Sequence, residues 1–124
     1  MPEQINWTLN VQVVGGPKIS ASNAITVDAY DKIEAEVLAG GSATVNVQPG
    51  DGAKFLLITA SSYSTDLTYV VDASGTTVTL DGAHVLIGAG AVSLLGNTQN
   101  QFVFTNAGSA DVTVSILVGR DPAP

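Results

Sequence analysis

The sequence of 124 residues contains no cysteine, a single histidine and only four basic residues. Charged residues make up 12% of the chain, about half the usual share for a globular domain. Without cysteine there are no disulfides and no thiolate ligands for a metal. The groups that enzymes use most for acid–base and nucleophilic chemistry are therefore scarce, which favours a non-enzymatic protein.

Basic residues are also scattered, and acidic residues outnumber them. The formal net charge is −7 at pH 7. The four basic residues stand singly in the chain, as Lys18, Lys32, Lys54 and Arg120. Because nucleic-acid binding depends on clustered Lys and Arg, we expect no nucleic-acid partner.

Long apolar runs are absent as well. The longest, 85–95, is interrupted by Gly88, Gly90 and Ser93, and it is shorter than the roughly 20 residues of a membrane-spanning helix. The N-terminal segment carries Glu3 and lacks the apolar core of a signal peptide. We therefore expect no membrane partner and a cytoplasmic location.

Apolar and polar residues alternate in several segments of the chain. In the first segment the apolar positions are Ile5, Trp7, Leu9, Val11 and Val13. The same period returns in 111–118, near the other end of the sequence. Side chains two residues apart share one face of a strand, so this alternation predicts β-strands at both ends of the chain.

Turns rich in glycine and proline separate these segments, and the strongest is Pro-Gly-Asp-Gly at 49–52. The turns predict hairpins over 33–47, 67–80 and 101–118. We count eight to ten short strands and no convincing helix. The sequence therefore predicts one all-β domain over residues 1–124, an antiparallel β-sandwich with a jelly-roll-like arrangement.

Glycine and alanine are frequent in segment 82–96, where Gly88 and Gly90 stand among larger apolar residues. The preferred interpretation is a buried strand pair with a glycine kink. Alternatively, the small residues allow another subunit to approach closely. Gly88 and Gly90 are therefore candidate subunit contacts, together with Leu38 and Leu117.

The single histidine, His84, follows Asp81, which suggests a base oriented by a carboxylate. With no second histidine and no Gly-x-Ser-x-Gly turn, we interpret His84 as structural, and we expect His84→Ala to leave fold and assembly nearly unchanged. Glu34 and Glu36 share a strand face, but a calcium site needs six or more oxygens, so we interpret this face as solvated. We predict no catalytic residue, no metal and no cofactor.

Aromatic residues point to an alternative function. Candidates for contacts with a ligand or partner are Tyr30, Tyr63 and Tyr69. Exposed rings of this kind stack on the faces of sugars in carbohydrate-binding sandwiches. The remaining large aromatics follow apolar strand registers and are expected in the core: Trp7, Phe55, Phe102 and Phe104. A carbohydrate- or ligand-binding module is therefore the alternative to a structural role.

Two stretches of the C-terminal half are rich in Ala, Gly, Thr and Val: VDASGTTVTLDGAHVLIGAGAVSLL and FVFTNAGSADVTVSILVGRD. In this composition and in their short predicted strands, residues 71–121 resemble small all-β structural proteins of bacteriophage particles. The resemblance includes no catalytic or ligand-binding motif. It implies a trimer or another symmetric assembly that docks on a larger particle as a decoration, tail or fibre component. A virion-associated location is therefore the alternative to a cytoplasmic one.

Low charge favours self-association too, because uncharged strand faces are easily covered by another copy of the chain. Apolar residues on otherwise polar faces support this interpretation: Val14, Leu38, Val103 and Leu117. We predict a structural assembly protein that forms a symmetric homo-oligomer, with a trimer favoured and more than about 1,000 Å² buried at each interface. A small hydrolase is the third alternative.

Overall fold

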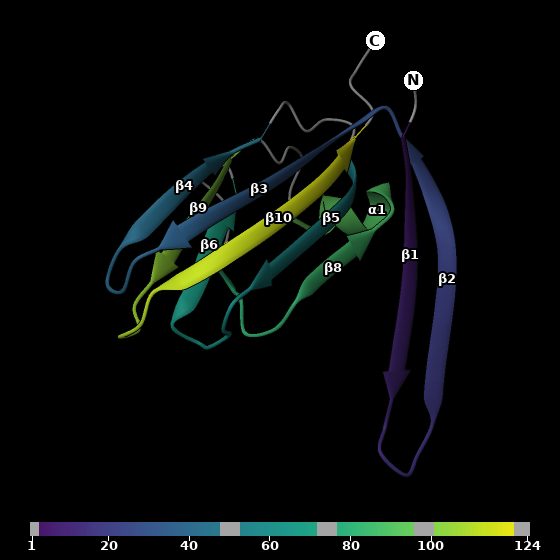
Figure 1. The fold of residues 1–124 in the computed structure, drawn as a ribbon, viewed down its shortest axis with the longest axis horizontal. Coiled ribbons are helices and arrows are strands. Elements are labelled where there is room, and N and C mark those ends of the chain that lie inside the picture. Colours follow the sequence, from purple (N-terminus) through teal and green to yellow (C-terminus); the bar gives the residue numbers. More distant parts are fainter. Residues whose placement is uncertain (1–2, 48–52, 72–76, 96–100, 121–124) are drawn as a thin grey trace.

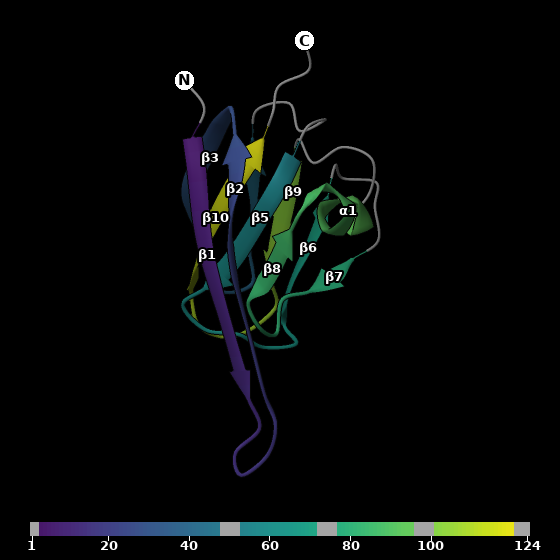
Figure 2. The ribbon, with the colours of Figure 1, turned by 90° about the vertical axis from the view of Figure 1, so that its right-hand side faces the viewer.

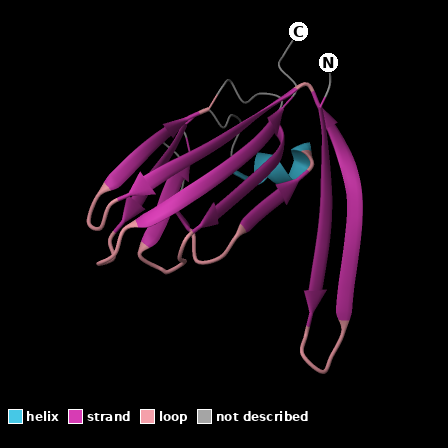
Figure 3. Cartoon of the chain, viewed as in Figure 1, coloured by secondary structure: helices cyan, strands magenta, loops and turns pink. Residues whose placement is uncertain are grey.

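The computed structural model describes residues 3–47, 53–71, 77–95 and 101–120. Their strands are β1 (Glu3–Gln12), β2 (Lys18–Val27), β3 (Ala29–Val37), β4 (Ser42–Asn46), β5 (Ala53–Ala60), β6 (Leu67–Val71), β7 (Val78–Thr79), β8 (His84–Ile87), β9 (Gln101–Asn106) and β10 (Val112–Arg120). A short helix, α1 (Ala89–Val92), and a 3₁₀ turn, η1 (Ser93–Leu95), follow β8. The predicted all-β class is confirmed (Figure 3).

Eight of these strands form two antiparallel four-stranded sheets that pack face to face (Figure 1). One sheet has the order β3-β10-β5-β8, and the other has the order β4-β9-β6-β7. The pairing of these eight strands is nested in the sequence, so that the first pairs with the last and the second with the second-last: β3 with β10, β4 with β9, β5 with β8, and β6 with β7. Successive pairs alternate between the two sheets, which is the arrangement of a jelly roll.

This nested pairing explains why two of the three predicted hairpins are wrong. The strands predicted to pair in 33–47 are β3 and β4, which lie in different sheets. The same is true of β9 and β10 in 101–118. Only the innermost pair of the jelly roll joins neighbouring strands, so the pairing predicted over 67–80 is confirmed. The turns predicted at 49–52 and 72–75 lie outside the described residues.

The core lies between the two sheets and is built from alternate residues of the facing strands. From β10 it receives Val112, Val114, Ile116 and Val118. From the opposite sheet, the rings of Tyr69, Phe102 and Phe104 pack together, with centroids 5.5 to 6.4 Å apart. The intervening residues of each strand face outward, as the period-two pattern requires.

Segment 82–96 differs from the predicted strand pair, because strand β8 ends at Ile87 and helical turns follow. Gly88 changes the direction of the chain with a φ of +96°, a conformation that favours glycine. Its N–H donates to the Lys54 carbonyl at 2.7 Å. The Ala-rich α1 then forms readily because alanine has the highest helix propensity, and Val92 anchors it in the core.

Strands β1 and β2 stand apart from the two sheets as a long antiparallel hairpin, here called the arm (residues 3–27). In Figures 1 and 2 the arm begins beside the end of β10 and diverges from the outer face of the β3-β10-β5-β8 sheet. Its far end extends well past the sandwich. The arm and this outer sheet face form the surface with the clearest potential for function.

Candidate functional site

One face of the arm is apolar and the other is polar. Residues directly opposite each other in an antiparallel pair share a face, so the two strands contribute to one stripe. The pairs on the apolar face are Ile5–Ile25, Trp7–Asn23, Leu9–Ala21 and Val11–Ile19. On the polar face, the Ser20 hydroxyl donates to Asn10 Oδ1 at 2.9 Å. The alternation therefore produces an apolar stripe along most of the arm.

At its base, the apolar face of the arm packs on the outer face of the β3-β10-β5-β8 sheet. Gly119 of β10 permits this close approach, because a Cβ there would lie 2.7 Å from Ile5 Cδ1 and 3.1 Å from Val27 Cγ1. Just beyond Val27, the Asp28 N–H donates to the Arg120 carbonyl at 3.0 Å. Side-chain packing and this backbone hydrogen bond together hold the arm to the sandwich.

Beyond Trp7, the apolar face of the arm is open to solvent. The exposed fraction is 42% for Leu9, 52% for Val11, 59% for Val13 and 68% for Ile19. Figures 1 and 2 show this half of the arm reaching past the sandwich strands. An isolated two-stranded hairpin is only marginally stable in water. The outer half of the arm therefore presents an apolar face that the described residues leave largely open to solvent.

The tip of the arm, residues 13–17, has the sequence Val-Val-Gly-Gly-Pro. The Gly16 N–H donates to the Val13 carbonyl at 2.7 Å and closes a tight turn. Gly15 has a φ of +75°, which other residues adopt only at a cost. Val14, an apolar residue expected on an otherwise polar face, is 99% exposed.

A groove of about 330 Å³ lies where the arm diverges from the sheet. Its arm side includes Ile5, Trp7 and Leu9, and its sheet side includes Leu57, Val85 and Leu117. Because the lining is mainly apolar, the groove suits apolar side chains better than a sugar or a charged ligand. Trp7, expected in the core, is half-buried in this groove instead, since the arm that carries it lies outside the sandwich.

The predicted subunit contacts lie in separate places. Leu117 lines the groove, whereas Leu38 lies in the turn after β3 and is 56% exposed. Gly88 and Gly90 lie at and within α1, because the strand pair expected there is replaced by a helical turn. Val103, expected on an otherwise polar face, is half-buried in β9. Of these positions, only Leu117 belongs to the surface formed by the arm and the sheet.

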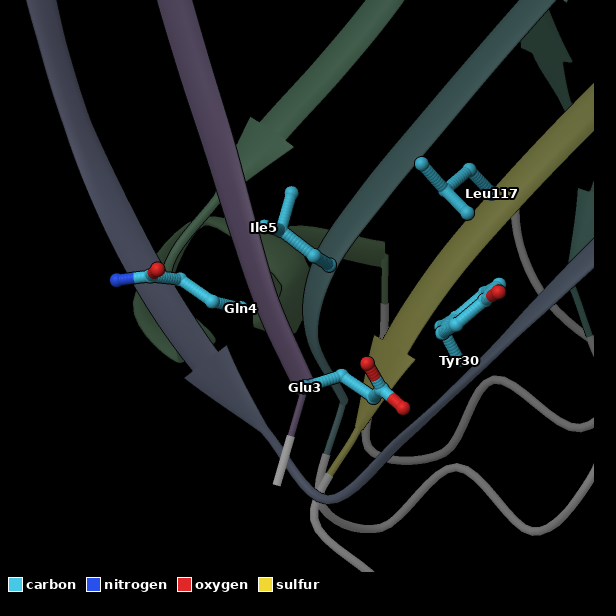
Figure 4. Close-up of a pocket in the computed structure, with 5 residues that line it drawn as sticks. All are labelled: Glu3, Gln4, Ile5, Tyr30 and Leu117. Atoms are coloured by element: carbon cyan, nitrogen blue, oxygen red, sulfur yellow. The ribbon is translucent and has the colours of Figure 1, made fainter. Parts of the chain in front are cut away.

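Tyr30 borders a second hollow of about 330 Å³, between the base of the arm and β3. Figure 4 shows the Glu3 carboxylate and the Tyr30 ring beside this hollow, with Leu117 near the ring and the side chain of Gln4 pointing away. Tyr30 is 53% exposed. An exposed ring close to a carboxylate has the chemistry needed to stack on a sugar and bind one of its hydroxyls.

The other two candidate tyrosines do not line this hollow. Tyr63 follows β5 and is 39% exposed, and its hydroxyl accepts a hydrogen bond from the Ala60 N–H at 3.2 Å. Tyr69 is fully buried, so its predicted role as a surface contact is wrong. Its side chain occupies an inward position of β6, where it packs against Phe102 and Phe104.

The single histidine pairs with this buried tyrosine. The Tyr69 hydroxyl lies 2.8 Å from His84 Nδ1, and the two ring centroids are 5.6 Å apart. Burial raises the pKa of Tyr69 to about 12, so the phenol remains protonated at neutral pH. The pair joins β6 of one sheet to β8 of the other, which supports a structural role for His84.

Replacing His84 with alanine is expected to lower the free energy of unfolding by about 1–3 kcal/mol, because it leaves the buried Tyr69 hydroxyl without this partner. This revises the expectation of a nearly neutral substitution. Urea unfolding followed by circular dichroism measures the effect. The double variant His84→Ala with Tyr69→Phe serves as the control, and it should lose less than the sum of the two single variants. Additive losses would contradict a stabilising pair.

Acidic residues do not gather into a metal site in the part of the chain that the structure describes. Glu34 and Glu36 are both exposed on the outer face of β3, where the sequence pattern placed them.

Comparison with known proteins does not add a family to this description. No protein-family model matches the chain, and no curated protein matches its sequence. Among the described residues, no helix has the length and apolar character required to cross a bilayer. The function must therefore be argued from the arm, the groove and the hollow beside Tyr30.

Proposed function

We propose that the protein is a structural assembly protein that forms a symmetric homo-oligomer through its arm. The observation that carries this proposal is the exposed apolar face of the outer half of the arm. Leu9, Val11, Val13 and Ile19 lie along it, each at least 42% exposed. Monomeric proteins rarely expose contiguous apolar surface of this kind, and such patches usually mark protein contacts.

The distribution of charge supports contact with another copy. Between residues 4 and 26 the arm has a single charged side chain, Lys18, although the whole chain has a net charge of −7. Beyond Glu3 at its base, the arm therefore lacks the acidic groups that would repel a second copy of this acidic protein. An apolar projection with one basic side chain and no acidic one is well suited to self-association.

Fold-level analogy supports two functions, because jelly rolls occur both in viral capsid proteins and in lectins. The resemblance of residues 71–121 to bacteriophage structural proteins favours the first. We therefore include docking on a larger, phage-like particle in the proposal, with a trimer as the expected oligomer. The runner-up is a carbohydrate-binding module, which the exposed Tyr30 beside Glu3 favours.

Sedimentation of the full chain at micromolar concentration tests self-association. We expect the wild-type chain to sediment as a homo-oligomer and Val11→Asp to raise the dissociation constant at least about 100-fold, because the new carboxylate lies in the buried contact. The matched control is Asn10→Asp, which adds the same charge to the opposite face of the same strand. It should change the dissociation constant by less than about threefold.

Two results would contradict the proposal. One is a wild-type chain that sediments as a monomer, and the carbohydrate-binding alternative would then take first place. The other is an oligomer that Val11→Asp and Asn10→Asp weaken equally, which would show that the apolar face of the arm is not the contact.

A further inference from the structure

The geometry points to a specific contact within this assembly: the tip of the arm of one copy, residues 13–17, inserts into the groove of a second copy. This inference rests on the proposed function and names the surface that receives the arm. It is a contact between two different patches of the same chain, since the tip and the groove lie at opposite ends of the arm.

The tip is the part of the arm without a polar side chain. Val13 follows the last strand residue and continues the apolar alternation of the arm, and Val14 lies in the turn that the Gly16 N–H closes on the Val13 carbonyl. The exposed fractions of these two side chains are 59% and 99%. Gly15, Gly16 and Pro17 complete the tip without adding a polar side chain.

The groove has apolar walls on two sides as well. Trp7 and Leu9 belong to its arm side, and Leu57 and Val85 belong to its sheet side. Each strand of the arm has one polar face, so a strand bound in the groove would place polar side chains against one of its apolar walls. The tip has no polar side chain, so it is the segment of the arm that can contact both walls of the groove with apolar groups.

Backbone hydrogen bonding reduces the cost of burying the tip. The Val13 N–H donates to the Pro17 carbonyl at 2.9 Å, and the Gly16 N–H donates to the Val13 carbonyl at 2.7 Å. Pro17 has no N–H. At Val13, Gly16 and Pro17 the tip therefore brings no unpaired backbone donor into an apolar groove, which lowers the penalty for burying the turn.

A tip cannot occupy the groove of its own chain. The groove lies beside Trp7 near the base of the arm, and Val13 follows six residues later on the same extended strand. Leu9 is the groove-lining residue of the arm nearest to the tip, and at about 3.4 Å per residue Val13 still lies roughly 14 Å beyond it. A tip that fills a groove must therefore enter the groove of a second copy, and each copy has both a tip to donate and a groove to receive one.

This head-to-tail contact closes into a ring when the rotation between copies permits it, and a trimer is the ring that we expect. A single tip is a small contact. In a closed ring each subunit makes the contact twice, and breaking one contact does not release a subunit. The groove volume of about 330 Å³ limits the insertion to a few side chains, which agrees with a five-residue tip.

Disulfide cross-linking between single-cysteine chains tests the contact, because the native chain has no cysteine. One chain has Val14→Cys, a second chain of different mass has Val85→Cys, and the two are mixed and oxidised. We expect the mixed disulfide to exceed either disulfide between identical chains by about tenfold, since a disulfide requires Cα atoms closer than about 7 Å. Gln12→Cys, on the polar face close to the tip, is the matched control and should cross-link poorly to Val85→Cys.

The outcomes separate this inference from the proposed function. An oligomer in which Val14→Cys couples mainly to itself, or in which Gln12→Cys couples to Val85→Cys equally well, would overturn tip insertion while self-association stands. A wild-type chain that is monomeric by sedimentation would overturn both. A mixed disulfide that forms only with the tip cysteine supports the contact.

Discussion

Replacing Asn106 with aspartate is expected to lower the free energy of unfolding by about 3–4 kcal/mol. Asn106 is the buried polar residue of the described chain, at 2% exposure. Its Nδ2 donates to the carbonyls of Val37 at 3.1 Å and Ala110 at 2.8 Å, and its Oδ1 accepts from the Gly108 N–H at 2.9 Å. Aspartate keeps the acceptor but loses both donors, so two carbonyls would face a buried carboxylate.

Urea unfolding measures this loss, and Asn46→Asp is the matched control. Asn46 is exposed at the end of β4, and its Oδ1 accepts from Gln101 Nε2 at 3.1 Å. Aspartate retains that acceptor, so the control should change stability by less than about 0.5 kcal/mol. If Asn106→Asp also lowered the free energy of unfolding by less than about 1 kcal/mol, the hydrogen bonds of the Asn106 amide would not stabilise the connection between β9 and β10.

Replacing Gly119 with valine is expected to displace the base of the arm and to lower stability by about 1–3 kcal/mol through overpacking. Even a Cβ at this position would contact Ile5 at 2.7 Å and Val27 at 3.1 Å. Ile5 Cδ1 is the end of a flexible side chain, so the arm should move before the sandwich unfolds. Since the groove depends on the position of the arm, the dissociation constant of the oligomer should rise at least about tenfold.

Trp7 gives a direct readout of this displacement, because it is the only tryptophan in the chain and lines the groove. Its fluorescence emission should shift to longer wavelength in Gly119→Val as the indole becomes exposed. Ser115→Val is the control, since Ser115 occupies the same outer face of β10 four residues away. Equal emission spectra for Gly119→Val and the wild-type chain would show that the contact of Ile5 with Gly119 does not determine the position of the arm.

The sequence by itself determined the type of structure that most segments adopt, with 88–95 as the exception. Alternation at Ile5, Trp7, Leu9 and Val11 predicts a strand whatever lies next to it, because the side-chain period of two is a local property of extended chain. The low share of charged residues in the whole chain was also visible, and it favoured coverage of some strand faces by another copy. These local signals were sufficient for the all-β class and for the expectation of self-association.

The tertiary structure alone decided which strands pair and where the site lies. The jelly roll pairs β3 with β10 and β4 with β9, and such distant pairing leaves no mark in the local pattern that predicted hairpins between neighbours. Burial of Tyr69 and exposure of Tyr30 likewise depend on which sheet face is covered. The groove combines Trp7 of the arm with Leu57 and Val85 of the sheet, and only packing brings these segments together. The alternation shows that a strand has an apolar face. Which segment covers that face depends on the whole fold.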